Sequence, residues 1–303
     1  MAAARSGNLL MRSLPDSLVP YAQLMRLDKP IGTWLLALPC FWSIALAASP
    51  GHLPDLHMVA LFGAGAVLLR GAGCTINDLW DRDLDARVER TRTRPLAAGT
   101  LTPRDAIVAL AVQLSLGLVI LLQLNDYSKV LGASSLLLVA TYPLMKRITD
   151  WPQAYLGLTF NWGALMGYAA AAGACDWHVV LPLYGAGIAW TLVYDTIYAH
   201  QDKKDDKVVG VKSTALLWGE RSKAWFVMFA GLCGLGLAGT GWASGAGPAY
   251  YAGAAAMIGH LAWQIRSVDL GNGPDCMAKF VSNKEAGALL LAGIVADRLM
   301  AGV

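Results

Sequence analysis

Two clusters of acidic residues are the part of the sequence best suited to chemistry. The first reads Asn77-Asp78-Leu79-Trp80-Asp81-Arg82-Asp83-Leu84-Asp85. A helix that continued through it would place Asp78, Asp81 and Asp85 on one face and turn Asp83 away. Carboxylates on one face repel each other unless a cation lies among them, and Mg2+ binds through carboxylates together with substrate phosphates. The spacing predicts a Mg2+ site; the alternative is a solvated acidic helix end.

The second cluster has the same one-sided spacing, with Asp195, Tyr198, Asp202 and Asp206 in one stripe and Asp205 beside it. Asp195 falls within an otherwise apolar stretch, where an ionisable residue is functional by default. The alternative for Asp195 is an acid at the membrane interface that reaches water. Two acidic stripes could clamp one diphosphate through Mg2+ ions, which would neutralise the charge that grows on a leaving diphosphate.

The two clusters also resemble an internal repeat. Asn77-Asp78-x-x-Asp81 and Gln201-Asp202-x-x-Asp205 share an amide-acid-x-x-acid pattern, and each follows an apolar stretch. Internal repeats with a site at their interface are common in membrane folds. The polar loops that follow the two copies are the longest in the chain, and long polar loops in compact folds tend to be functional.

Basic residues accompany the acidic clusters. Arg70 lies on the same helical face as Asn77 and Asp81, roughly 10 to 16 Å deeper by helix rise, and at that depth a guanidinium needs an anionic partner. The partner is either a substrate anion or Asp195 in a structural salt bridge.

A further basic group follows the predicted fourth apolar stretch. Tyr142 and Lys146 share a face, and Arg147 is adjacent; these residues either bind phosphate or a substrate carboxylate, or anchor the helix at the membrane interface. Similar candidates for anion contacts, or else solvated loop cations, are Arg92, Arg94 and Lys212.

The composition indicates what must position these residues. The 303-residue chain is 56% hydrophobic and 15% charged, with a mean hydropathy of +0.46, which excludes an ordinary soluble fold. Its apolar runs of roughly 17 to 25 residues suit helices that cross a hydrocarbon core about 30 Å thick. The sequence predicts nine spans: 30–48, 58–78, 104–123, 129–146, 155–173, 179–199, 223–242, 248–265 and 286–302.

The basic residues support this count and give an orientation. All but Arg70, Lys129 and Arg298 of the 24 lysines and arginines lie in or beside the N-terminal segment and the loops after the second, fourth, sixth and eighth spans. Such an excess marks the cytoplasmic-type side of a membrane. The net charge of +3 comes from these loops, so we expect no nucleic-acid partner.

We expect residues 21–303 to form one membrane domain, preceded by an N-terminal segment, 1–20. The segment carries Arg5 and Arg12 and no acid before Asp16, which fits a mitochondrial targeting remnant or the basic N-terminus of a bacterial inner-membrane protein. The five scattered cysteines form no CxxC pair and are expected to be buried free thiols.

The chain resembles the UbiA family of intramembrane aromatic prenyltransferases. The family signature NDxxDxxxD matches Asn77, Asp78, Asp81 and Asp85, its second acidic motif matches the region of Asp195, Asp202 and Asp206, and its YxxxK motif matches Tyr142 to Lys146. Longer stretches at 26–33, 70–77, 142–147 and 194–202 match the branch that acts on 4-hydroxybenzoate in ubiquinone biosynthesis. The resemblance extends from about residue 24 to 298.

The resemblance implies an all-α membrane protein, a nine-helix bundle whose polar cap binds polyprenyl diphosphate while the isoprenoid tail lies in a tunnel open to lipid. It implies one Mg2+ at Asp78, Asp81 and Asp85, and another at Asp202 and Asp206. The resemblance and the motifs together give Asp195, Arg70 and Lys146 as catalytic candidates. The candidate substrate contacts are Asn77, Tyr142, Lys146, Arg147, Arg70, Tyr198, Gln201, Lys212, Arg92 and Arg94.

The implied reaction is transfer of a polyprenyl group to the ring carbon ortho to the hydroxyl of 4-hydroxybenzoate. The acceptor would attack an allylic cation and then lose a proton, in a pocket from which water is excluded. The resemblance further implies the mitochondrial inner membrane with the site toward the matrix, or a bacterial inner membrane with the site toward the cytoplasm. Association with other proteins of ubiquinone biosynthesis is also expected.

Three other functions are compatible with parts of the sequence. A relative of the same family could prenylate another acceptor, such as homogentisate or haem. A CDP-alcohol phosphotransferase also uses membrane aspartates, but its D-G-x-x-A-R opening is missing here. A cation transporter could use Asp195 and Arg70 as a gated pair, although transport sites lie near the bilayer midplane and these acids gather at one face.

Overall fold

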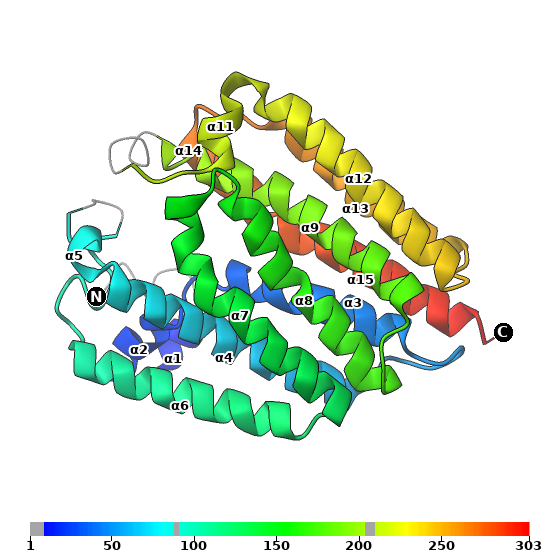
Figure 1. Cartoon of the computed structure of the whole chain (residues 1–303), viewed down its shortest axis with the longest axis horizontal. Coiled ribbons are helices and arrows are strands. Elements are labelled where there is room, and N and C mark those ends of the chain that lie inside the picture. Colours follow the sequence, from blue (N-terminus) through cyan, green and yellow to red (C-terminus); the bar gives the residue numbers. More distant parts are fainter. Residues whose placement is uncertain (1–8, 88–90, 204–209, 303) are drawn as a thin grey trace. The chain divides into compact units, whose positions relative to one another are not determined.

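The computed structural model describes residues 9–87, 91–203 and 210–302, and over these residues the regular structure is entirely helical (Figure 1). Each predicted span coincides with a helix to within a few residues. These helices are α3 (Ile31–Leu46), α4 (Leu56–Trp80), α6 (Pro103–Leu122), α7 (Asp126–Ile148), α8 (Pro152–Ala172), α9 (Trp177–Ala199), α12 (Ser222–Ala243), α13 (Pro248–Ser267) and α15 (Asn283–Met300).

Several short helices lie between these long ones and were not predicted as elements. They are α1 (Leu9–Ser13), α2 (Val19–Leu24), α5 (Arg82–Asp85), α11 (Thr214–Trp218), the 3-10 helix η2 (Gly219–Arg221) and α14 (Gly273–Val281). None is long enough to cross a bilayer. Two of them, α2 and α14, contact the candidate site residues described below.

The ends of the long helices follow from local sequence. Thr102 and Asp105 form a reciprocal capping box at the start of α6. The side chains of Asn125 and Asp176 accept backbone N–H groups at the starts of α7 and α9. Gly173, with a φ of 90°, ends α8 in the left-handed conformation that glycine adopts readily.

Among the residues that the structure describes, four helical segments are long and apolar enough to cross a membrane by length and composition. They are α4, α6, α9 and the stretch Thr214–Ala243 that contains α12. Other long helices carry polar side chains that bond to neighbouring helices, which lowers their hydropathy. In α8, for example, Asn161 donates to Oγ1 of Thr191 in α9 at 2.9 Å.

The chain divides into two compact units. The first comprises the described residues up to Trp34 together with Gly63–Gln123, and the second comprises Leu35–Phe62 and the described residues from Leu124 onward. In the first unit, α2 packs on α6, with Leu24, Leu96, Leu101 and Ala106 forming a small buried core.

In the second unit, α9 packs against α8, α12 and α14, and α13 packs along α15 (Figure 1). Trp190 of α9 lies 5.3 Å from Trp42 of α3, measured between ring centroids, and donates to Oδ1 of Asn283 in α15 at 2.8 Å. Gly253 and Gly293 lie where α13 and α15 touch backbone to backbone. All five cysteines are free, and all but the half-buried Cys175 are buried.

Candidate functional site

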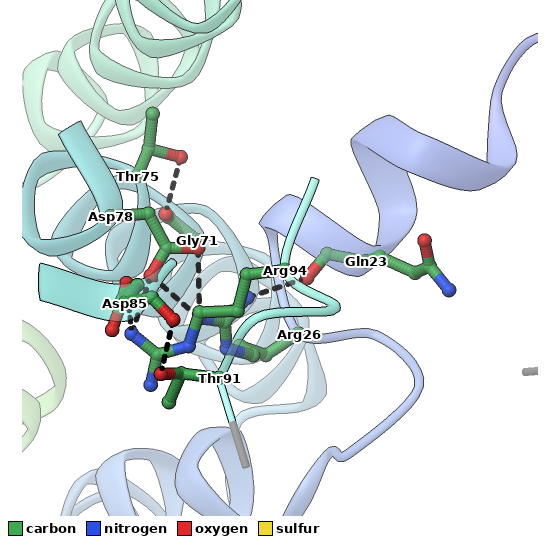
Figure 2. A network of polar contacts seen from close by, with 8 residues as sticks. All are labelled: Gln23, Arg26, Gly71, Thr75, Asp78, Asp85, Thr91 and Arg94. Carbon is green, nitrogen blue, oxygen red and sulfur yellow. Dashed lines mark hydrogen bonds and ion pairs between the residues drawn. The ribbon is translucent and has the colours of Figure 1, made fainter. Parts of the chain in front are cut away.

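Asp78 lies at the centre of a network of ion pairs at the end of α4 (Figure 2). Nη2 of Arg26 donates to both carboxylate oxygens of Asp78, at 2.7 and 2.8 Å. Nη1 of Arg94 donates to Oδ1 of Asp78 at 3.1 Å and to Oδ2 of Asp85 at 2.7 Å. Asp78 is 1% exposed and Asp85 is 7% exposed. Two guanidinium groups thus place positive charge beside these carboxylates, where the sequence predicts a Mg2+ ion.

The guanidinium of Arg26 is oriented by the end of α2. The N–H groups of Arg26 and Leu27 donate to the carbonyl oxygens of Gln23 and Ala22, at 3.0 and 2.9 Å, a pattern that closes a helix through a left-handed residue. Arg26 has a φ of 59°, a conformation that costs a non-glycine residue about 1 kcal/mol. Nη1 of Arg26 also donates to the Gln23 carbonyl oxygen at 2.9 Å. Backbone and side chain together direct Nη2 at Asp78.

Arg94 is positioned by the segment that follows the first cluster. The hydroxyl of Thr91 donates to the carbonyl oxygen of Asp85 at 3.0 Å, and the N–H of Arg94 donates to the carbonyl oxygen of Thr91 at 2.9 Å. Leu96 and Leu101 then bury their side chains in the small core of the first unit. Burial of these leucines fixes the segment, so Arg94 reaches the carboxylates while Arg92, two residues earlier, is exposed.

The first cluster does not lie on one continuous helix, which is the condition for placing Asp78, Asp81 and Asp85 on one face. The helix α4 ends at Trp80, and Asp81 has a φ of −97° and a ψ of 8° before α5 begins. The helical register survives, because the N–H of Asp81 donates to the Asn77 carbonyl oxygen at 2.9 Å and the N–H of Asp85 donates to the Asp81 carbonyl oxygen at 2.8 Å. The break therefore changes the backbone locally and leaves Asp78 and Asp85 on the same side.

Asp83 has different surroundings from its acidic neighbours. Its side chain is 81% exposed and pairs with Arg82 at 3.1 Å. Asp81 is half-buried, as is Asn77. The structure thus brings Asp78 and Asp85 together on Arg94 and leaves Asp83 outside that network.

Arg70 packs against Gly32, the second residue of α3. A Cβ atom at Gly32 would overlap the guanidinium of Arg70, so glycine is required for this close approach. Arg70 and Asp195 belong to different compact units, so the proposed pairing between them stays a prediction.

The second cluster lies at the end of α9, beside α14. The ring of Tyr198 lies 4.6 Å from that of Phe280 in α14, and Nε2 of Gln201 donates back to the Tyr198 carbonyl oxygen at 3.0 Å. Asp195 and Asp202 are half-buried. Asp205 and Asp206 lie outside the described residues.

The predicted basic group gathers at the end of α7. The N–H of Lys212 donates to the carbonyl oxygen of Lys146 at 3.0 Å, which joins the loop after α9 to α7. Lys146, Arg147 and Lys212 are exposed, and Tyr142 is half-buried.

Ser213 and Thr214, which follow Lys212 and begin α11, are buried, and Thr214 is bonded to two further helices. The N–H of Thr214 donates to Oε1 of Gln153 in α8 at 3.0 Å, and its hydroxyl bonds to that of Thr196 in α9 at 2.6 Å. This segment therefore connects the basic group to the helix that carries the second acidic cluster.

His200 follows α9 and is buried against Ser222. Its Nε2 lies 3.0 Å from the Ser222 hydroxyl. Burial, with a smaller contribution from Lys203, lowers the pKa of His200 to about 4, so the imidazole is neutral at pH 7. A neutral ring adds no charge to the second cluster.

The first cluster fits a divalent cation whose remaining ligands come from a substrate. Within residues 9–87, 91–203 and 210–302, no three His, Cys, Asp or Glu side chains are grouped closely enough to hold a metal ion by themselves. Asp78 and Asp85 nevertheless offer hard oxygen donors that converge on one nitrogen of Arg94. Mg2+ typically takes one or two carboxylates and completes its shell with water and phosphate oxygens.

Sequence reasoning gave no role to Arg26 or to Phe280. Arg26 makes its contact with Asp78 across 52 residues of chain, which no local pattern predicts. The amphipathic helix α14 was overlooked because it is far shorter than a span. The sequence offers no signal for Arg26, because the helix end that it closes is itself visible only in the structure.

Comparisons with known proteins show the family and the fold. The UbiA prenyltransferase family matches residues 36–290. The chain is 61% identical to the mitochondrial 4-hydroxybenzoate polyprenyltransferase of Arabidopsis thaliana over 94% of this chain and 70% of that protein. It is 58% identical to the protein of the same name from Rattus norvegicus over 98% of this chain and 80% of the relative.

Solved structures show the same fold. The apo structure of a UbiA homologue from Aeropyrum pernix K1 superposes with a TM-score of 0.74 at 26% identity, covering 87% of this chain and 97% of that chain. A UbiA homologue from Archaeoglobus fulgidus bound to GPP and Mg2+ superposes with a TM-score of 0.71 at 19% identity, covering 91% and 98%. The chain belongs to the UbiA prenyltransferase family.

Proposed function

We propose that this chain transfers a polyprenyl group from polyprenyl diphosphate to the ring carbon ortho to the hydroxyl of 4-hydroxybenzoate, as a Mg2+-dependent enzyme of ubiquinone biosynthesis. The observation that carries the proposal is the 61% identity, over 94% of the chain, to a relative named for this activity. The two neighbouring carboxylates of Asp78 and Asp85 are compatible with it, because Mg2+ held by one or two carboxylates can take its remaining ligands from a diphosphate.

Two sets of carboxylates would hold the metal. Asp78, Asp81 and Asp85 would bind one Mg2+, and Asp202 with Asp206 would bind a second. Mg2+, when bound, neutralises charge on the departing diphosphate. The Mg2+ reported with the Archaeoglobus fulgidus homologue agrees with this choice of ion.

The basic and polar residues would orient the two substrates. Arg70, Lys146 or Arg147 would hold the carboxylate of the acceptor or the diphosphate, and Asp195 would act close to the reacting atoms. Further contacts to substrate would come from Asn77, Tyr142, Tyr198, Gln201, Lys212, Arg92 and Arg94. The bonded segment Lys212–Thr214 supports this arrangement, since it joins the basic end of α7 to α9.

The proposal places the reaction at a membrane. Residues 21–303 would form one domain of nine spans, preceded by the segment 1–20, with a polar cap on one face of the bilayer and the isoprenoid tail in contact with lipid. The mitochondrial inner membrane is the proposed location, with the catalytic face toward the matrix, and other enzymes of ubiquinone biosynthesis are proposed partners. The names of the relatives support a mitochondrial site.

A transfer assay tests the proposal directly. Membranes that contain the chain should attach a radiolabelled polyprenyl group to 4-hydroxybenzoate when Mg2+ is present, and excess EDTA should abolish the product. Homogentisate should be a poor acceptor in the same assay. Product formation that persists in EDTA would exclude the metal site, and preference for another acceptor would exclude the proposed substrate.

A further inference from the structure

Guanidinium groups already contact both carboxylate oxygens of Asp78. Two guanidiniums face two carboxylates, and both oxygens of Asp78 accept from Nη2 of Arg26. A divalent cation bound to Asp78 with Arg26 still in place would lie against that guanidinium in a part-buried site, where like charges repel. A cation that binds Asp78 must therefore compete with a guanidinium.

Arg26 is the guanidinium whose presence the local backbone does not explain. Its left-handed φ of 59° closes α2 in a turn that glycine would close with less strain. The arginine side chain offsets part of that strain through its hydrogen bond to the Gln23 carbonyl oxygen. That side chain bridges the end of α2, at the Gln23 carbonyl oxygen, to Asp78 on α4. The contact with Asp78 is the part of this bridge that reaches beyond the turn, to a carboxylate of the first acidic cluster.

We propose that Arg26 is a positioning residue that, with Arg94, takes the place of the divalent cation at Asp78 and Asp85, and that cation binding displaces the Arg26 guanidinium from Asp78. The inference rests on the proposed function for the assignment of these carboxylates to a metal. Arg26 keeps Asp78 neutralised and correctly oriented while the site is empty of substrate. The displaced guanidinium is then free to pair with phosphate oxygens, which accept from arginine as carboxylates do.

Competition predicts that removal of the Arg26 charge tightens cation binding. The experiment uses the purified full chain in detergent, stripped with EDTA, without either substrate. Mn2+ is titrated in, and free Mn2+ is followed by its EPR signal. In Arg26→Gln and Arg26→Gly the dissociation constant should fall about tenfold, because one competing unit charge has been removed from a part-buried site.

Matched variants separate charge from backbone effects. Arg26→Gln keeps the strained backbone and Arg26→Gly relieves it, so equal tightening in both assigns the effect to charge. Arg26→Lys keeps the charge and should bind Mn2+ like the unaltered chain. Arg82→Gln removes a guanidinium that pairs with exposed Asp83, and it should leave Mn2+ binding unchanged.

Thermal unfolding gives a second measurement. Without metal, Arg26→Gln should unfold at a lower temperature than the unaltered chain, because Asp78 has lost a buried partner. Saturating Mn2+ should close that gap, since the metal then supplies the missing charge. A gap that persists at saturation, or Mn2+ binding that weakens or stays the same in Arg26→Gln and Arg26→Gly, would overturn the inference.

The outcome is independent of the acceptor. A chain that binds Mn2+ in this competitive manner but does not prenylate 4-hydroxybenzoate would contradict the proposed function and leave the inference standing. If the unaltered chain binds no Mn2+ without substrate, the inference is wrong, whereas the metal site of the proposed function is tested separately by the EDTA arm of the transfer assay.

Discussion

Asp83 and Asp81 are two residues apart but differ in what surrounds them. Asp83 is exposed and touches only its neighbour Arg82 among the contacts described above, whereas Asp81 is half-buried at the junction of α4 and α5. We expect Asp83→Ala to retain transfer activity and Asp81→Ala to lose it by about a hundredfold or more, the size of effect typical when a charged group at a reacting site is removed.

Initial rates of prenyl transfer test this pair of variants, with size-exclusion chromatography in detergent to check that both remain folded. Asp202→Ala should behave like Asp81→Ala. An inactive but folded Asp83→Ala would contradict the separation of acidic residues by helical face.

His200 makes stability depend on pH. Burial lowers its pKa to about 4, below the ordinary 6.5 of an exposed histidine. Between these two values the histidine is protonated in the unfolded chain and neutral in the folded chain. The free energy of unfolding should therefore be unaffected by His200 above about pH 6.5. It should decline as the pH falls toward 4, by about 3 kcal/mol at most. His200→Gln should remove this part of the decline. Unfolding midpoints of both proteins between pH 4 and 7 measure the difference.

At the scale of elements, the crossing of α13 and α15 depends on two glycines. A Cβ atom at Gly253 would lie 2.7 Å from Cα of Gly293 and 2.9 Å from the Leu289 carbonyl oxygen. These are backbone atoms, so the helices would have to move apart. Gly253→Ala should destabilise the fold by about 1–3 kcal/mol, as overpacking does.

Gly259 provides a control in the same helix. A Cβ atom there meets nothing within 4 Å, so Gly259→Ala should be neutral or slightly stabilising, because alanine favours helix more than glycine. Thermal unfolding of the two variants in one detergent makes the comparison. Equal midpoints would mean that the crossing tolerates a larger separation.

The long helices could be predicted because their cause is local. A run of apolar residues long enough to cross a bilayer favours helix wherever it occurs, and the nine predicted spans coincide with helices. The short α2 and α14 could not be found this way, since α14 buries only one face of a nine-residue segment. Helical periodicity likewise placed Asp78 and Asp85 together, but no glycine or proline marks the break at Asp81.

The partners of the acidic residues depend on the fold. The contact between Arg26 and Asp78 requires that α2 end beside α4, and the position of Arg94 depends on burial of Leu96 and Leu101. Sequence patterns gave the types of side chain in the candidate site, whereas these non-local contacts decide which of them neutralise each other.

At the scale of the whole molecule, the distribution of basic residues predicts an orientation. Asp83 and Glu220 lie in loops assigned to the basic face, and Asp126 lies in a loop assigned to the other; all three are exposed. Cysteines introduced singly at these positions should react with a membrane-impermeant maleimide from one side for Asp83→Cys and Glu220→Cys, and from the opposite side for Asp126→Cys.

Vesicles of known and opposite sidedness make that measurement. Labelling of Asp126→Cys from the same side as the other two would mean that the number of spans between these loops is wrong. The result would not depend on enzyme activity, because it reports only which loops face which compartment.

The burial of the native thiols makes the chain convenient for such chemistry. Cys40, Cys74, Cys233 and Cys276 are buried, and Cys175 is half-buried with its thiol directed to the Leu165 carbonyl oxygen. A bulky, water-soluble reagent should therefore find little to modify in the unaltered protein. Fluorophores or spin labels can be attached at chosen loops without first building a cysteine-free background, so distances between loops become measurable in the native sequence.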